Sequence, residues 1–223
     1  MSEGVVTALE IQKRNKERVN VFVDGAYAFS LSLMEAASLR KGQTLTEADI
    51  ARLRGEDAII KAVDSAAHFL GYRPRSTAEV RRNLAEKDVP PEVIDAAVER
   101  MTALGYLDDE AFARYWVQNR GEFKPLSQRA LRQELRQKGV DHPVIEVVLE
   151  DVGEADLAYK AAQTQLRRLR RATHKDFHTK LANFLQRRGF SYSIARDVIQ
   201  RLVDELEAED PDYFDQKRES DEE

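Results

Sequence analysis

Within the first 32 residues, three short runs alternate between apolar and other side chains with a period of two. Val19, Val21 and Val23 form one such run, and the two others are Val5, Thr7, Leu9, Ile11 and Tyr27, Phe29, Leu31. Period-two runs rich in Val, Phe and Tyr predict half-buried β-strands, and the dipeptide Asp24-Gly25 favours a tight hairpin turn. We therefore expect an antiparallel meander over about residues 4–32. It must pack on a helix or a partner, because three short strands are only marginally stable alone.

Beyond residue 32 the apolar spacing becomes helical. A helix is expected around residues 33–39, followed by Arg40-Lys41-Gly42, where Gly suits a helix C-terminal cap. Thr46 and Asp49 resemble a capping box, which opens a second short helix reaching Leu53. After Gly55 the rest of the chain is predicted to be helical.

The helical part repeats itself at a spacing of about 50 residues. Residues 75–100 align with 126–151 at a shift of 51, which places Ser76 on Ser127. A third copy follows at a shift of 50, which places Gly139 on Gly189. Upstream, Asp57 aligns with Asp108. Self-similarity at a fixed period indicates stacked supersecondary units.

Each copy is predicted to hold three helices. The first covers 57–71, 108–120 or about 154–171, and the second begins at Ser76, Ser127 or about Phe177. The second ends near Asp88, Gly139 or Gly189, since Gly adopts the left-handed closing conformation freely and Asp at some cost. The third helix follows a step rich in Pro or Ser, and Pro is well tolerated in a first turn.

The expected fold is mostly α. Three tandem three-helix repeats form an elongated curved stack, preceded by a small N-terminal antiparallel β meander. The expected segments are 1–55 for the meander with its short helices, 56–106, 107–152 and 153–207 for repeats 1, 2 and 3, and 208–223 for an acidic tail expected to be disordered.

Composition agrees with this architecture. Charged residues make up 34% of the 223 residues and hydrophobic residues 42%, which suits narrow helices with one buried stripe. The absence of cysteine excludes disulfides and thiolate chemistry. The N-terminus does not resemble a secretory signal, and no apolar run approaches the ~18 residues that span a bilayer. A cytoplasmic protein with no membrane partner is expected.

Charge is unevenly distributed along the chain. Residues 204–223 hold eleven acidic residues and two basic ones, Lys217 and Arg218, a net charge of -9. Residues 1–203 therefore hold 33 basic and 29 acidic residues, a net charge of +4. The acidic end has two interpretations. It is a solubilising disordered segment, or it competes with nucleic-acid phosphates or an acidic partner for the basic faces of the protein.

No arrangement of residues predicts catalysis. The chain has no phosphate-binding glycine loop, nucleophile elbow or metalloprotease motif. His174 and His178 lie one helical turn apart, but a zinc site needs three or four ligands, so an exposed polar face is favoured. Asp108-Asp109 fits a helix start better than a catalytic pair. We expect a binding protein with no cofactor, metal site or small-molecule substrate.

Two kinds of side chain are candidates for contacts with a partner. Phe112 and Trp116 share a helix face and are expected in the core, while Tyr115 points outward. Basic residues surround the second helix of each repeat, and between Gln165 and Gly189 there are eight basic residues against one acidic, Asp176. Such an excess favours contact with phosphates or an acidic protein groove, although a plain solvated face is the alternative. The candidate residues are Arg73, Arg75, Arg81, Arg82, Arg129, Arg132, Arg136, Lys138, Arg167, Arg168, Arg170, Arg171, Lys175, Lys180, Arg187 and Arg188.

The sequence resembles the RecX family of bacterial recombination regulators. The resemblance rests on RSTAEVRRNLAEKDVP, on VIDAAVERMTALGYLDDEAFARYWVQNR and on LRQELRQKGVDHPVIEVVLE. It covers about residues 5–205, and GYLDDEAFARYWV is its most specific part. The N-terminal VTALEIQKRNKERVNVFVDG and LRKGQTLTEADI are similar to the longer members, whereas repeat 3 is more divergent.

The resemblance implies a function. Such proteins bind the RecA–DNA filament along its groove, inhibit the ATPase, strand-exchange and coprotease activities of RecA, and promote filament disassembly. Direct contact with single-stranded DNA, or with DNA inside the filament, is left open by the resemblance. A monomer is expected, since no long heptad seam is exposed. The alternative is an autonomous helical DNA-binding protein or transcriptional regulator.

Overall fold

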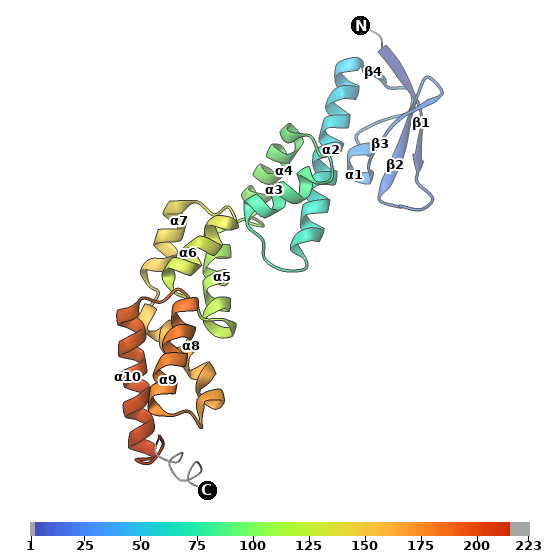
Figure 1. The fold of residues 1–223 in the computed structure, drawn as a ribbon. Coiled ribbons are helices and arrows are strands. Elements are labelled where there is room, and N and C mark those ends of the chain that lie inside the picture. Colours follow the sequence, from blue (N-terminus) through green and yellow to red (C-terminus); the bar gives the residue numbers. More distant parts are fainter. Residues whose placement is uncertain (1–2, 215–223) are drawn as a thin grey trace. The chain divides into compact units, whose positions relative to one another are not determined.

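The computed structural model describes residues 3–214, which fold into two compact units (Figure 1). The first unit contains the chain up to Arg75 together with Glu79–Leu107. The second contains Ser76–Ala78 and the chain from Asp108 onward. No helix among residues 3–214 combines the length and the apolar character that crossing a bilayer requires.

The first unit opens with a four-stranded antiparallel sheet. Its strands are β1 (Glu3–Ile11), β2 (Arg18–Val23), β3 (Ala26–Ser32) and β4 (Thr44–Thr46), in the order β3-β2-β1-β4. The predicted meander is therefore confirmed, and Asp24 and Gly25 form its tight turn with φ of 51° and 82°. Strand β4 was not predicted, because three residues are too few to display an alternation.

Strand β1 changes its buried face part-way along. Val6 is fully buried whereas Val5 is 41% exposed, but Leu9 packs against the same core. The pairing with β2 is irregular between Val6 and Ala8. Such a bulge inserts one residue and reverses which side chains point inward, so a strict period of two could not identify the buried positions of β1.

Two helices follow the sheet in the first unit, α1 (Leu33–Ala36) and α2 (Glu47–Leu70). The Thr46 capping box is confirmed, with the Thr46 hydroxyl accepting from the Asp49 N–H at 3.1 Å. The expected break at Gly55 is wrong, because α2 runs through it without interruption (Figure 1). Glycine in a helix costs about 1 kcal/mol relative to alanine. Burial of Leu53 in the sheet core and of Ala66 in the repeat 1 core offsets this cost.

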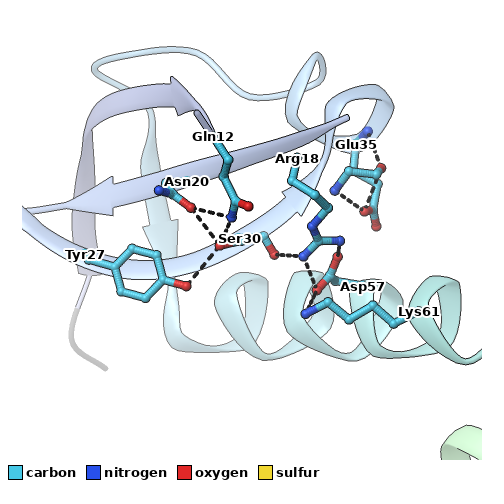
Figure 2. Close-up of polar contacts among 9 residues, drawn as sticks. Gln12, Arg18, Asn20, Tyr27, Ser30, Glu35, Asp57 and Lys61 are labelled. Carbon is cyan, nitrogen blue, oxygen red and sulfur yellow. Dashed lines mark hydrogen bonds and ion pairs between the residues drawn. The ribbon is translucent and has the colours of Figure 1, made fainter. Parts of the chain in front are cut away.

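Continuity of α2 gives Asp57 a role that its alignment with Asp108 did not suggest. Asp57 lies in the middle of α2, is 4% exposed, and forms a two-pronged ion pair with Arg18 of β2 (Figure 2). Lys61 reaches the same carboxylate at 2.8 Å. Burial acts to raise the pKa of Asp57, but the hydrogen bonds and charges of Arg18 and Lys61 outweigh it and hold that pKa below its ordinary value. This ion pair joins the sheet to the helix.

The remaining helices form the three expected repeats. Repeat 1 consists of the second half of α2, α3 (Thr77–Ala85) and α4 (Pro91–Ala103). Repeat 2 consists of α5 (Asp109–Phe123), α6 (Gln128–Gln137) and α7 (His142–Glu150). Repeat 3 consists of α8 (Glu154–Leu169), α9 (His174–Arg187) and α10 (Tyr192–Glu209). The residues after each second helix, Asp88, Gly139 and Gly189, have positive φ as expected.

Repeat 3 departs from prediction at both of its ends. Helix α9 begins one turn before Phe177, because Thr173 caps it by accepting from the Asp176 N–H at 3.2 Å. Helix α10 continues to Glu209, and Phe214 packs against the core. Residues 208–214 are thus ordered where an acidic tail was expected, while 215–223 lie outside the described residues.

Repeats 2 and 3 share one hydrophobic core, which extends from Phe112 to Val203. At their junction, the Ser127 N–H donates to the Arg188 carbonyl at 3.1 Å. Gly189 follows with φ of +90°, and a Cβ there would lie 2.5 Å from the Ser127 Oγ. Gly189 therefore serves as a helix terminator and as the point of close approach between two repeats.

Replacement of Gly189 by alanine should destabilise the second unit by about 2–4 kcal/mol. The left-handed conformation and the clash with Ser127 each contribute to that range. Urea unfolding followed by fluorescence of Trp116 measures this, since the single tryptophan packs on the core of that unit. Ser127→Ala should cost less in the Gly189→Ala background than alone, because it removes the clashing oxygen. Additive losses would contradict this explanation.

Candidate functional site

Basic residues of repeat 1 are largely held by other side chains. Arg73 donates to Glu79 at 2.9 Å, and Arg81 pairs with Asp95. Arg75 lies over the Phe69 ring at 4.0 Å, and burial lowers its pKa. Arg82 is exposed on α3. These contacts hold most of the repeat 1 arginines in place rather than leaving them free for a partner.

In repeat 2, too, other side chains hold the basic residues, except for Arg129 and Arg136. Arg132 pairs with Glu146 at 2.6 Å, a hydrogen bond that raises the arginine pKa, and Lys138 lies 4.6 Å from the Trp116 ring. Arg129 and Arg136 are exposed, and neither forms an ion pair within residues 3–214. Within the described residues, these are the cations of α6 that no ion pair holds.

The densest free positive charge lies where α8 ends and α9 begins. We call this surface the α8–α9 basic cluster, and it consists of Arg167, Arg168, Arg170, Arg171 and Lys175. All five side chains are exposed, and none forms an ion pair with a carboxylate in the described part of the chain. Residues 165–175 contain no Asp or Glu, so no acidic neighbour one helical turn away is available within this stretch.

Helix geometry explains part of this arrangement. Arg167 and Arg168 occupy the last turn of α8 and Arg170 its C-terminal cap, where cations are favourable to the helix dipole. One or two cations satisfy that role. Five exposed cations without counter-charge repel one another, and an incoming polyanion would relieve that repulsion. The cluster is accordingly the strongest candidate binding surface.

Three other predicted basic residues of repeat 3 are separate from the cluster. Lys180 pairs with Asp176 at 3.2 Å along α9. Arg187 is exposed at the far end of α9. Arg188 is half-buried, donates to the Pro125 carbonyl at 3.4 Å and lies 5.0 Å from the Phe184 ring. Burial lowers the Arg188 pKa, and its contacts place it in the junction between repeats 2 and 3.

The aromatic side chains of α5 lie as expected. Phe112 is buried and Tyr115 is 41% exposed. Trp116 packs on the core, and its indole N–H donates to Glu134 at 2.8 Å. Arg120 donates to the same carboxylate at 2.7 Å and stacks 4.4 Å from the indole. These contacts fix Trp116 in place, so it has a structural role in repeat 2.

The two histidines of α9 lie side by side, as their spacing predicted. His174 and His178 stack with ring centroids 4.6 Å apart, and among residues 3–214 no group of three potential ligands converges. Burial lowers the pKa of His178, and the neighbouring His174 lowers it further.

Asp108 caps α5 by accepting from Glu110 and Ala111 N–H groups at 2.9 Å, which confirms its predicted structural role.

One feature of this region was missed from the sequence. Phe214 contacts His174 and Phe177, with ring centroids 5.1 and 5.3 Å apart. The charge of the surrounding segment predicted disorder. The signal available was the pair Tyr213-Phe214, two large aromatic residues in an otherwise acidic stretch.

Comparison with family models shows similarity in four consecutive segments. Residues 4–46 match the regulatory protein RecX N-terminal domain. Residues 62–101, 108–149 and 153–199 match the first, second and third three-helix domains of RecX. The matched segments follow the sheet and the three repeats in order.

Whole proteins show the same similarity. Regulatory protein RecX of Lactobacillus delbrueckii subsp. bulgaricus is 35% identical over 209 residues, covering 92% of this chain and 77% of the relative. Regulatory protein RecX of Bacillus subtilis is 33% identical, with 92% and 78% covered. A crystal structure of regulatory protein RecX matches with a TM-score of 0.70 and 28% identity, over 87% of this chain and 98% of the other. The RecX structure from Lactobacillus salivarius, 23% identical, matches with a TM-score of 0.58 over 66% and 97%, and supports the fold alone.

Proposed function

The chain belongs to the RecX family of regulatory proteins, and on that premise we propose that it binds the RecA–DNA filament and inhibits RecA. The activities expected to fall are ATP hydrolysis, strand exchange and coprotease function. The protein acts by binding rather than by catalysis. The observation that carries the proposal is the match of all four domains in chain order to RecX.

The α8–α9 basic cluster supplies a physical basis for binding. A RecA–DNA filament offers DNA phosphates and acidic protein surface, and exposed Arg and Lys bind both. The cations of the cluster lie within nine residues of one another, from Arg167 to Lys175, on two helix ends that share one core. We propose this cluster as the principal contact, with Arg129, Arg136 and Arg187 as further contacts.

Inhibition follows from preferential binding. A protein shifts a filament between states only to the extent that it binds one state more tightly than the other. Multiple repeats allow contacts with several sites on a repeating filament, which multiplies the effective affinity if the geometry permits simultaneous contacts. Inhibition by this route therefore requires binding alone, without any chemical reaction catalysed by the repeats.

The direct test measures RecA ATP hydrolysis on single-stranded DNA. Adding this protein at several-fold excess over RecA should lower the hydrolysis rate at least fivefold, because the filament state that hydrolyses ATP is depleted. The matched control is DNA and ATP with this protein but without RecA, which should show no hydrolysis. An unchanged RecA rate at that excess would refute the proposal.

The same assay components distinguish RecA inhibition from the alternative, autonomous DNA binding. A regulator that reads DNA alone would bind a specific duplex tightly without RecA and leave the ATPase unaffected. A RecA modulator should bind short DNA weakly and without sequence preference, through phosphate contacts that weaken as salt rises.

A further inference from the structure

By analogy with the junction of repeats 2 and 3, the C-terminal turn of the described chain packs where the second helix of a fourth repeat would end. At the 50-residue spacing, Phe177 of repeat 3 corresponds to Ser127 of repeat 2. Ser127 contacts Gly189 and Arg188 of the following repeat. Phe177 instead contacts Phe214, from the turn that follows α10, with centroids 5.3 Å apart. The turn thus covers the end of the last repeat, as terminal caps of repeat proteins do.

This cap lies beside the start of α9, next to the α8–α9 basic cluster. Phe214 lies 5.1 Å from His174, the residue directly before Lys175 in α9. Tyr213 stacks on Phe214 at 4.9 Å. Burial raises the pKa of Tyr213, and the positive charge of Arg170 opposes that rise.

The residues that follow Phe214 carry a net charge opposite in sign to that of the α8–α9 basic cluster. Residues 215–223 contain five acidic residues, Asp215, Glu219, Asp221, Glu222 and Glu223, and two basic ones, for a net charge of -3. Nine residues reach up to about 30 Å when extended, which is ample for the cluster next to the Phe214 anchor. A segment tethered this closely has an effective concentration in the millimolar range.

We propose that residues 215–223 bind the α8–α9 basic cluster of their own chain and thereby compete with external polyanions for it. The Phe214 cap is the anchor, and the acidic side chains are the ligand. The inference rests on the proposed function only for its biological consequence, namely that the filament must displace the tail. A merely solubilising tail would need no aromatic anchor beside the cluster.

Tail position is tested first, in the full chain. The protein has no cysteine, so Ser220→Cys accepts a single nitroxide label. The label should broaden the backbone amide signals of Arg170, Arg171 and Lys175 at low salt. Broadening should weaken severalfold near 1 M salt, where the Debye length is about 3 Å, because only the tether then keeps the label near the cluster. Absence of selective broadening at low salt would overturn the proposal.

Competition is tested second, with matched charge changes. The variant Asp221→Asn, Glu222→Gln, Glu223→Gln brings the net charge of 215–223 to zero. It should bind a fluorescent oligothymidine about 3–10-fold more tightly, if the tail occupies roughly 70–90% of clusters in the parent. The control Glu86→Gln, Glu92→Gln, Glu99→Gln removes three exposed charges from α4 and the end of α3, and should change affinity less than twofold.

The outcomes separate the two proposals. Equal affinities of the tail variant and the control would overturn tail competition. Tail docking and competition without any effect on RecA would refute the proposed function alone. If oligothymidine binding is too weak to measure, the nitroxide experiment decides.

Discussion

Neutralising four residues of the α8–α9 basic cluster is expected to raise the concentration needed to inhibit RecA by about 30- to 1,000-fold. The variant combines Arg167→Gln, Arg170→Gln, Arg171→Gln and Lys175→Gln. Each side chain is exposed and free of ion pairs within the described residues. Four exposed charge contacts at about 0.5–1 kcal/mol each sum to about 2–4 kcal/mol, which corresponds to that range. The measurement is a titration of RecA ATP hydrolysis on single-stranded DNA.

A second quadruple variant provides the control. Arg52, Arg100, Arg114 and Arg196 are exposed arginines that already pair with neighbouring carboxylates. Their replacement by Gln changes the net charge equally and should shift inhibition less than threefold. Circular dichroism should show equal helical content in both variants. Equal losses of inhibition would mean that total charge, rather than this cluster, determines binding.

Much of the fold follows from sequence periodicity. The repeat alignment placed the ends of the second helices correctly, because Gly139 and Gly189 need positive φ wherever such a helix closes. It failed at Gly55, where tertiary burial of Leu53 and Ala66 carries α2 through a local helix breaker. The alignment also paired Asp57 with Asp108 and so predicted the same role for both. Asp108 caps α5, but Asp57 lies inside α2 because that helix is continuous. Two residues at equal repeat positions acquire different roles when one helix begins eleven residues earlier.

The candidate surface was only partly accessible from sequence. Counting charges identified the excess in 165–189 but could not separate free cations from bound ones. Arg188 and Arg170 are two residues of the same type, yet Arg188 is half-buried at a repeat junction and Arg170 is exposed. That difference depends on which neighbours the fold brings together. The position of Phe214 likewise depends on the end of α10 lying beside Phe177.

Removing the charge of Arg18 should destabilise the first unit by about 3–5 kcal/mol at neutral pH. Arg18→Met keeps much of the side-chain volume but leaves the buried Asp57 carboxylate with Lys61 alone (Figure 2). Breaking a buried pair from one side costs this much because an under-compensated charge stays out of water. Amide hydrogen exchange of Val19 and Val21 measures the loss, while Trp116 fluorescence, which reports on the second unit, should be unchanged.

The pH dependence and two further variants identify the cause. The folded-state pKa of Asp57 is lowered, so its contribution is present above the ordinary carboxyl pKa and is lost as pH falls through the folded value. The deficit of Arg18→Met should therefore shrink in acid. Adding Asp57→Leu should recover most of the stability, since apolar replacements of a whole buried pair are often neutral. Arg100→Met, which breaks the exposed pair with Glu56, should cost less than about 1 kcal/mol. A pH-independent deficit, or no recovery in the double variant, would show that Arg18 acts through packing instead of charge.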